Sequence, residues 1–415
     1  MLNKETAPRC PGGGGKFALS VRTDPARGSL VTCYSIVVVY QSRVTFAMTS
    51  SSNRGESVEN KETDDTVSDF GAASNDPDYS GYSLIESPDD NFDDNFRPRV
   101  CDMSDLTGGP AARDRFTDTL GAAMEDVGIA ILINHGIGAE ELQATDVHAL
   151  NVFTTIPDEQ KLRFVSTDCA YGEPYYLGYV PLQESMPALP HAVEAWEFGR
   201  SAFRIPGEDA DKALSCWPAE KFEAAFRQFW QACEELMPQL GRALLRYLDV
   251  DPSVYDEKIF PTNDVLRINH YPSISPAAGS LASPARVLSH EDYGLISLMT
   301  ASPIEGLQVY RPRSKAWSRV HTPADSLVVI SGEWLRIVSN DRFRACTHRV
   351  SVPRENAQRA VPRVTVLYTL HPYEASVVEV LPGFHPKHRP TSGREFMTRV
   401  ADRLSERCKS LTNHP

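Results

Sequence analysis

The sequence contains no Cys-x-x-Cys pair, no apolar run long enough to cross a membrane, and no excess of basic side chains. The eight cysteines are widely spaced, which gives no sign of a zinc ribbon or redox pair and favours free thiols in a reducing compartment. The apolar run at 36–40 is five residues long, whereas a spanning helix needs about twenty. A net charge of −13 argues against a nucleic-acid binder, which needs a basic face.

Residues 1–48 differ in composition from everything that follows. They hold six basic and two acidic side chains and include a Pro-Gly run. Two interpretations stay open. The stretch is an organelle transit peptide, which is typically basic and poor in acidic residues, or it is a gene-model extension upstream of a true start at Met48.

Residues 49–96 form an acidic stretch with two basic and thirteen acidic side chains. Such a composition cannot bury enough apolar surface to fold, so it predicts a disordered tail. Its last eight residues repeat a short acidic piece that contains Phe92 and Phe96. This piece is either a docking motif or solvated linker.

Apolar periodicity predicts a folded region that begins near residue 97. Apolar residues recur at three and four positions in segments typical of helices that pack on a core. A short apolar run typical of a buried strand, 128–133, ends in a turn at His135, which we interpret as structural rather than as a ligand. The expected helices are 112–126, 139–154, 219–247 and a final amphipathic helix at 392–407.

The most informative stretch runs from Asn269 to Thr365. His290 and Asp292 are two residues apart, so in a strand they project to the same side. His348 follows 56 positions after Asp292, beyond several short β-branched runs that predict antiparallel strands. Two imidazoles and one carboxylate leave about half of an octahedral shell open, as in the facial triad of non-haem Fe(II) oxygenases.

Arg363 opens a later strand and indicates a carboxylate ligand beside this metal. Its planar guanidinium matches a carboxylate through two parallel hydrogen bonds. Thr365, two residues on, offers a hydroxyl on the same face. Tyr271 offers a phenol that could add another hydrogen bond.

The order of these pieces resembles the isopenicillin N synthase-like, 2-oxoglutarate- and Fe(II)-dependent dioxygenases. The matching pieces cover roughly residues 97–400 and are, in order, Asn269-x-Tyr271-Pro272, His290-x-Asp292, Gly306-Leu-Gln-Val309, Gly332-x-x-Leu335-x-x-x-Ser339-Asn340, His348-Arg-Val350 and Arg363-x-Thr365. The resemblance implies a mainly β protein with flanking helices and a double-stranded β-helix (jelly-roll) core.

The resemblance also implies the ligands of each group. Fe(II) would be held by His290, Asp292 and His348. The cosubstrate 2-oxoglutarate would be held by Arg363, Thr365 and Tyr271, with Asn269 nearby. O2 is the second cosubstrate.

Some positions depart from the usual pattern of this family. Glu291 stands where many plant members have threonine. A glutamate at this position resembles isopenicillin N synthase itself. Arg336 stands where glutamine is common and would add positive charge near the pocket. Candidate substrate-contacting residues, taken from positions beside the ligands, are Val287, Met299, Leu307, Arg336, Val350, Leu367 and Thr369.

The resemblance implies an oxidoreductase that oxidises an unactivated C–H bond of a small specialised metabolite and releases succinate and CO2. Hydroxylation, desaturation and oxidative ring closure remain open. One alternative is an oxidase or cyclase that does not use 2-oxoglutarate, and another is a non-catalytic jelly-roll binding protein. We expect a monomer without nucleic-acid or membrane partners, cytoplasmic unless the first residues direct it to an organelle.

The expected organisation follows from these assignments. An N-terminal region of helices and strands spans 97–250, the jelly-roll core spans 251–390, and the C-terminal helix lies within 391–415.

Overall fold

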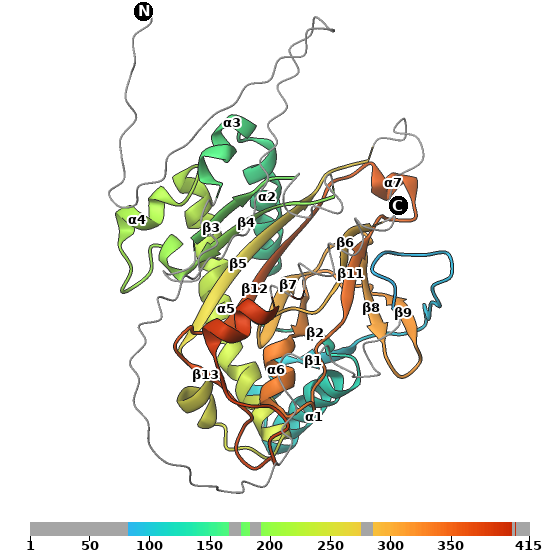
Figure 1. Ribbon diagram of the computed structural model, residues 1–415. Helices are drawn as coiled ribbons and strands as arrows, with labels where there is room; N and C mark the ends of the chain where they lie inside the picture. Colours follow the sequence, from blue (N-terminus) through green and yellow to red (C-terminus); the bar gives the residue numbers. More distant parts are fainter. Residues whose placement is uncertain (1–81, 166–175, 183–191, 275–284, 401–402, 404–415) are drawn as a thin grey trace, which may run out of the picture. The chain divides into compact units, whose positions relative to one another are not determined.

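The computed structural model describes residues 82–165, 176–182, 192–274, 285–400 and 403, all within one compact unit (Figure 1). The predictions for residues 1–48 and for 49–81 of the acidic tail lie outside these described residues.

Two sheets carry the fold. The strands of the larger sheet, in spatial order, are β1 (Arg99–Asp102), β2 (Ile129–Ile133), β10 (Leu327–Ser331), β7 (Ile296–Thr300), β12 (Arg363–Pro372), β5 (Thr262–Tyr271), β4 (Glu194–Gly199) and β3 (Tyr176–Val180). The strands of the smaller sheet are β6 (Ala285–His290), β11 (His348–Ser351), β8 (Leu307–Arg311) and β9 (Ala316–Arg319). A separate pair joins β13 (Val377–Val378) and β14 (Thr391–Ser392). In both large sheets the pairing is antiparallel except between β1 and β2.

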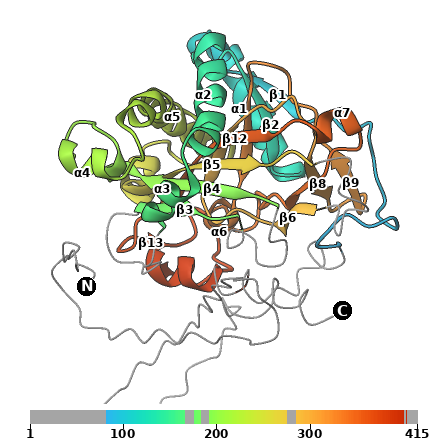
Figure 2. The same ribbon diagram turned by 90° about the horizontal axis from the view of Figure 1, so that it is seen from above.

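Helices flank the larger sheet (Figures 1 and 2). They are α1 (Pro110–Asp126), α2 (Ala139–Thr154), α3 (Asp158–Lys161), α4 (Ala210–Ser215), α5 (Glu220–Tyr247) and α6 (Glu333–Val338). The short helix α7 (Asn356–Arg359) lies near the smaller sheet instead. Single turns occur at η1 (Met103–Thr107), η2 (Leu162–Phe164), η3 (Arg200–Ala202) and η4 (Tyr255–Ile259). Among the described residues no helix is long and apolar enough to cross a membrane.

The strand β2 is apolar throughout because both of its faces are buried. Ala130 and Leu132 join the core beneath the helices, whereas Ile129 and Ile131 join a second core. The second core also contains Met299 of the larger sheet and side chains of β8 in the smaller sheet, so the two sheets pack face to face. This is the mainly β, jelly-roll architecture with flanking helices that the sequence predicts.

The two longest strands, β5 and β12, alternate between the helical core and the interior of the jelly roll. Val366, Tyr368 and Leu370 of β12 pack beneath the helices, as do Leu266 and Ile268 of β5. Because successive side chains of a strand point to opposite faces, the intervening residues of both strands face the space between the sheets.

The predicted elements are confirmed with small shifts at their ends. The helices expected at 112–126, 139–154 and 219–247 are α1, α2 and α5, and the strand expected at 128–133 is β2. Of the helix expected at 392–407, the structure describes residues 393–400 and 403 as helical.

The last part of the acidic tail is not solvated linker. Residues 82–96, which we name the N-terminal strap, lie against the smaller sheet beside β8 and β9 (Figures 1 and 2). The prediction of a disordered tail is therefore wrong for this part. Its carboxylates are neutralised by arginines of the sheet, in ion pairs such as Asp90–Arg349 and Asp94–Arg319, and sequence composition does not report such partners.

Gly332 permits a close approach of two backbone segments behind Asp292. A Cβ added at this position would lie 2.1 Å from the Gly294 carbonyl oxygen and 2.8 Å from that of Asp292. The Asp292 carbonyl also accepts a hydrogen bond of 2.8 Å from the Glu333 amide at the start of α6. A glycine at 332 is therefore needed to keep the Asp292 loop in place.

We expect Gly332→Ala to lower the free energy of unfolding by about 1–3 kcal/mol, because overpacking forces the backbone to shift. Urea denaturation measures this change. Gly138→Ala is the control, since a Cβ there meets no atom within 4 Å, and it should cost less than about 1 kcal/mol. Equal stability of the two variants would contradict the prediction.

Candidate metal and cosubstrate site

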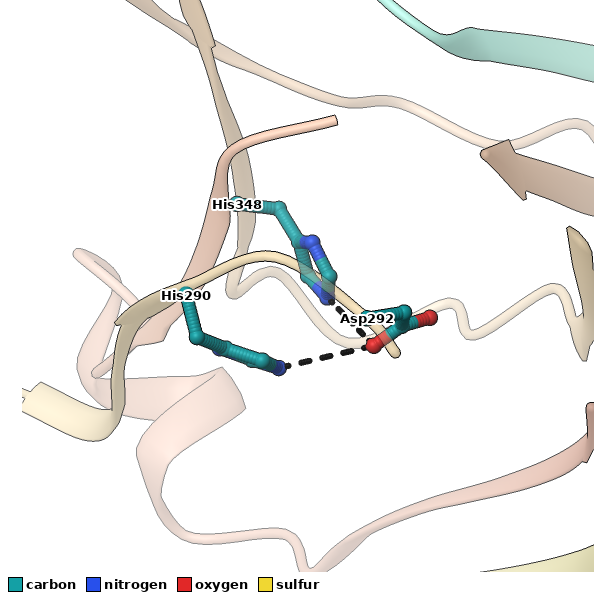
Figure 3. Close-up of side chains that lie close together, drawn as sticks. All are labelled: His290, Asp292 and His348. Carbon is teal, nitrogen blue, oxygen red and sulfur yellow. Dashed lines mark ion pairs between the residues drawn. The ribbon is translucent and has the colours of Figure 1, made fainter. Parts of the chain in front are cut away.

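The three predicted metal ligands come together in the structure. His290 ends β6 and pairs with His348, the first residue of the neighbouring strand β11, while Asp292 follows two residues after His290. One donor atom of each residue lies within 4.8 Å of the others. Asp292 Oδ1 is 3.7 Å from His290 Nε2 and 3.8 Å from His348 Nε2 (Figure 3). Two atoms that each lie about 2.1 Å from one ion can be up to about 4.2 Å apart, and both of these distances are within that limit.

Hydrogen bonds aim these donor atoms at the shared point. His290 Nδ1 lies 2.8 Å from the Leu288 carbonyl oxygen, and His348 Nδ1 lies 3.0 Å from that of Cys346. A carbonyl can only accept, so each Nδ1 carries the proton and each Nε2 keeps its lone pair for a metal. Ser297 donates to the other Asp292 oxygen, Oδ2, at 2.6 Å.

The protonation states suit cation binding. Burial, assisted by the nearby His348, lowers the pKa of His290 to about 4, so this imidazole is neutral at pH 7. Burial would raise the pKa of Asp292, but His348, His290 and the Ser297 hydroxyl together lower it below its usual value. The cluster thus offers two imidazole nitrogens and one carboxylate, a set that suits Fe(II) with open positions.

The predicted carboxylate-binding residues lie side by side across the β5–β12 ladder. Arg363 pairs with Tyr271 and Thr365 with Asn269, and all four side chains are buried. The Arg363 guanidinium carbon lies 5.0 Å from the centre of the Tyr271 ring. Burial lowers the pKa of Arg363, and Tyr271 and Asp146 oppose that shift.

Two polar atoms of this group are buried without a hydrogen-bond partner, Arg363 Nη1 and Thr365 Oγ1. Buried donors of this kind are costly unless they are paired, above all on a cation. A bound carboxylate would accept from both atoms, so the residues present fit the far end of 2-oxoglutarate.

A cavity of about 360 Å³ contains the metal-ligand side chains. Asn269 and Tyr271 also line it, whereas Arg363 and Thr365 are not among its lining residues. Six of the seven residues predicted to contact substrate line this cavity: Val287, Met299, Leu307, Val350, Leu367 and Thr369.

Arg336 is the exception, and its assignment to the pocket is wrong. It lies on α6, where its guanidinium forms ion pairs with Glu333 at 2.9 Å and Asp341 at 2.5 Å. Burial would raise the pKa of Glu333, but Arg336 and Arg403 lower it to about 2. The positive charge of Arg336 is thus used within this network.

Sequence reasoning missed several polar residues around the cavity. Glu197 of β4, Arg267 of β5 and His371 of β12 line it, and Asp146 of α2 lies close enough to Arg363 to affect its pKa. The strand period could have indicated Arg267 and His371. Arg267 lies two positions before Asn269, and His371 lies six positions after Thr365. Residues an even number of positions apart in a strand share one face. Glu197 and Asp146 carried no local signal.

His371 gives a testable pH dependence. Burial lowers its pKa to about 4, against about 6.5 in an unfolded chain. Between these values the unfolded chain binds more protons, so stability is present above pH 6.5 and is lost as the pH falls towards 4.

We expect His371→Asn to reduce this acid-induced loss, by about 1–3 kcal/mol between pH 7 and pH 4. Urea denaturation of the metal-free protein across this range measures it. His321→Asn, at an exposed position, is the control and should keep the wild-type slope. A His371→Asn slope identical to the wild type would refute the assignment.

Comparison with known proteins adds independent information to this geometry. Residues 262–372 match the family model of the 2OG-Fe(II) oxygenase superfamily, and residues 99–220 match that of the non-haem dioxygenase N-terminal region named for morphine synthesis. The first match contains all three candidate metal ligands together with Arg363 and Thr365. The chain belongs to the isopenicillin N synthase-like 2-oxoglutarate- and Fe(II)-dependent oxygenases.

Curated relatives and solved structures agree with this membership. The oxygenase is 26% identical over 301 residues to a proline hydroxylase, buaE, of Petromyces alliaceus, covering 71% of this chain and 92% of that one. It is 28% identical over 272 residues to gibberellin 3-beta-dioxygenase 1 of Oryza sativa, covering 62% and 66%. In fold it is similar to a rice dioxygenase for auxin oxidation, with a TM-score of 0.58, 22% identity and coverage of 75% and 96%.

Membership fixes the class of chemistry. This oxygenase is a 2-oxoglutarate-dependent Fe(II) oxidoreductase that acts on a small molecule. The named relatives act on different compounds, so membership alone does not select the substrate.

Proposed function

We propose that this oxygenase holds Fe(II) through His290, Asp292 and His348. We propose that it binds 2-oxoglutarate through Arg363, Thr365 and Tyr271, with Asn269 beside them, and oxidises an unactivated C–H bond of a small metabolite. The observation that carries this proposal is the convergence of the three ligand atoms within 4.8 Å, in a cavity beside the buried Arg363, whose Nη1 has no hydrogen-bond partner.

Iron and 2-oxoglutarate, when bound, reduce O2 to oxidise the substrate, and the cosubstrate becomes succinate and CO2. The chain supplies position and exclusion of water. The lone pairs of His290 Nε2 and His348 Nε2, together with the Asp292 carboxylate, would hold the metal. The apolar lining, Val287, Met299, Leu307, Val350 and Leu367, keeps the substrate close to the metal.

The test is succinate formation by the purified full chain with Fe(II), 2-oxoglutarate and fractions of a metabolite extract. Succinate and CO2 formation that increases when a fraction is added supports the proposal. A product 16 mass units heavier than its substrate indicates hydroxylation. A product 2 mass units lighter indicates desaturation or ring closure. O2 consumption with no succinate from any fraction would favour the oxidase alternative instead. Absence of metal binding would favour a non-catalytic protein.

The presence of Glu291 does not favour the oxidase alternative. Glu291 resembles the residue of isopenicillin N synthase, but it does not line the cavity. Its carboxylate instead accepts a hydrogen bond of 2.7 Å from Thr347. We infer that Glu291 does not decide which cosubstrate is used.

A charged pair in the cavity limits the classes of substrate that would fit. Glu197 and Arg267 face each other in register across β4 and β5 and form an ion pair, and Arg267 Nε donates to Asn269 Oδ1 at 2.8 Å. Arg267 is four positions from Tyr271, or roughly 13 Å along the strand. Arg267 and Tyr271 therefore lie at separate places along β5, with Asn269 between them. We propose that the pair binds the polar end of the substrate. Arg267 would donate to an acceptor of the substrate, and Glu197 would accept from a neighbouring donor. An amino acid and a cyclic amide both carry such an acceptor beside a donor.

We expect Arg267→Met to lower kcat/KM for the substrate by roughly 10–100-fold, since a hydrogen bond to a charged group contributes about 1.5–3 kcal/mol. The KM for 2-oxoglutarate should change much less, because among the described residues Arg267 is hydrogen-bonded to the cosubstrate residues only through Asn269. Arg313→Met, at a largely exposed arginine, is the matched control. An equal loss for 2-oxoglutarate would show that Arg267 serves the cosubstrate instead. A panel of amino acids and cyclic amides separates the two substrate types.

We also propose that the enzyme acts as a monomer in the cytoplasm or an organelle and binds no nucleic acid. The net charge of −13 supports the last point. Gel filtration and cell fractionation test the other two.

A further inference from the structure

The strands that carry the metal ligands have a second face, turned away from the metal. His290 and His348 point to the cavity, so the residues beside them point the opposite way. These neighbours include Ser289 and Glu291 around His290, and Arg349 after His348. All three are buried, and each is hydrogen-bonded to the N-terminal strap.

Backbone hydrogen bonds fix the strap on this second face. The Ser289 amide donates to the Leu84 carbonyl oxygen at 2.9 Å, next to a candidate metal ligand. Further along, Trp317 of β9 donates to the Asn91 carbonyl oxygen and accepts from the Asp93 amide, each at 2.8 Å. The strap therefore pairs with the smaller sheet through its backbone as well as through its side chains.

Arg349 ties the strap to the strand of His348. Its side chain is fully buried, and its guanidinium lies 3.8 Å from the centre of the Trp317 ring. It donates to Asp90 at 2.7 Å and to Gln308 Oε1 at 2.8 Å. A buried cation is costly without a charged partner, so Asp90 of the strap stabilises Arg349 in this position.

Glu291 ties the strap to both ligand-bearing strands. It lies between His290 and Asp292 in the chain, and its Oε1 accepts from Tyr82 of the strap and from Thr347, each at 2.7 Å. Thr347 immediately precedes His348. One buried carboxylate therefore cross-links the segments that supply the three ligand atoms.

We propose that the N-terminal strap is a positioning element of the metal site. Through Tyr82–Glu291–Thr347 and Asp90–Arg349 it holds the two strands in the register that brings the ligand atoms together. This inference rests on the metal site of the proposed function. The strap precedes residues 99–220 and 262–372, which match the family models.

The first test is the affinity of the full chain for Mn²⁺, followed by electron paramagnetic resonance of the free ion. Tyr82→Phe removes one hydroxyl, and Asp90→Asn removes the charge opposite Arg349. Each should raise the Kd for Mn²⁺ by roughly tenfold, because groups that orient metal ligands typically contribute 10–100-fold. Tyr373→Phe removes a hydroxyl from a tyrosine outside the strap and should leave the Kd unchanged.

The second test asks whether the strap positions the metal ligands or only covers the surface of the smaller sheet. If strap docking strengthens metal binding, then metal binding must strengthen strap docking by the same factor. Hydrogen exchange of amides in residues 82–96 should therefore slow when Mn²⁺ is added to the wild type, and slow less in Tyr82→Phe.

The proposal is overturned if both variants bind Mn²⁺ with the wild-type Kd and exchange in the strap does not respond to the metal. Wild-type protein that binds no Mn²⁺ would instead overturn the proposed function itself. The two failures are therefore distinguishable from the wild-type titration alone.

Discussion

Replacing Asp292 by alanine is expected to abolish metal-dependent succinate formation. Asp292 supplies the only carboxylate of the three ligand atoms that lie within 4.8 Å of one another. Its loss leaves two imidazoles and no anionic ligand, a set that binds a hard divalent cation poorly. The Kd for Mn²⁺ should rise by more than about 100-fold, beyond the effect of changing a group that only supports a ligand.

The matched control for Asp292→Ala is Asp118→Ala, which removes a carboxylate from an exposed position of α1. It should bind Mn²⁺ and form succinate as the wild type does. Circular dichroism of both variants checks that the fold is retained. Succinate formation by folded Asp292→Ala at more than a tenth of the wild-type rate would rule out the proposed ligand set.

Replacing Arg363 by methionine is expected to separate stability from function. Arg363 Nη1 is buried with no hydrogen-bond partner, so removing the charge should stabilise the protein measured without 2-oxoglutarate or leave its stability unchanged. The same change removes the guanidinium that would pair with 2-oxoglutarate. The kcat/KM for 2-oxoglutarate should fall by roughly 30-fold to several thousand-fold, because breaking a buried charge pair costs about 2–5 kcal/mol.

Thermal unfolding with and without 2-oxoglutarate measures both effects of Arg363→Met. The wild type should gain stability on adding 2-oxoglutarate, and the variant should gain none at the same concentration. Arg363→Lys keeps the charge but loses the planar fork, so its kcat/KM should lie between those of the wild type and Arg363→Met. A variant that retains the full 2-oxoglutarate-induced shift would exclude Arg363 as the cosubstrate anchor.

The N-terminal strap changes how the acidic composition of the chain is interpreted. Asp90, Asp94 and Glu86 form ion pairs with Arg349 and Arg319 on the smaller sheet. Because these arginines are largely buried, their acidic partners are part of the folded structure. A low-complexity acidic sequence can thus order when it meets a complementary basic surface of its own chain.

The sequence by itself determined the class of fold and the candidate residues for the metal and the cosubstrate. The period-two spacing of Arg363 and Thr365 placed both on one face of β12, because strand geometry is local. The same spacing predicted that His290 and Asp292 lie together, although β6 ends at His290 and Asp292 lies in the loop that follows. Helix positions followed from the same kind of local period, as at α1, α2 and α5.

Only the tertiary structure decided which faces meet and which charges find partners. It moved Arg336 out of the pocket and into ion pairs on α6, put Glu197 opposite Arg267 in the cavity, and docked residues 82–96 behind the metal ligands. Local periodicity states which side chains share a face. The partner of a charged side chain is set by segments far away in the chain, 209 positions away for Tyr82 and Glu291.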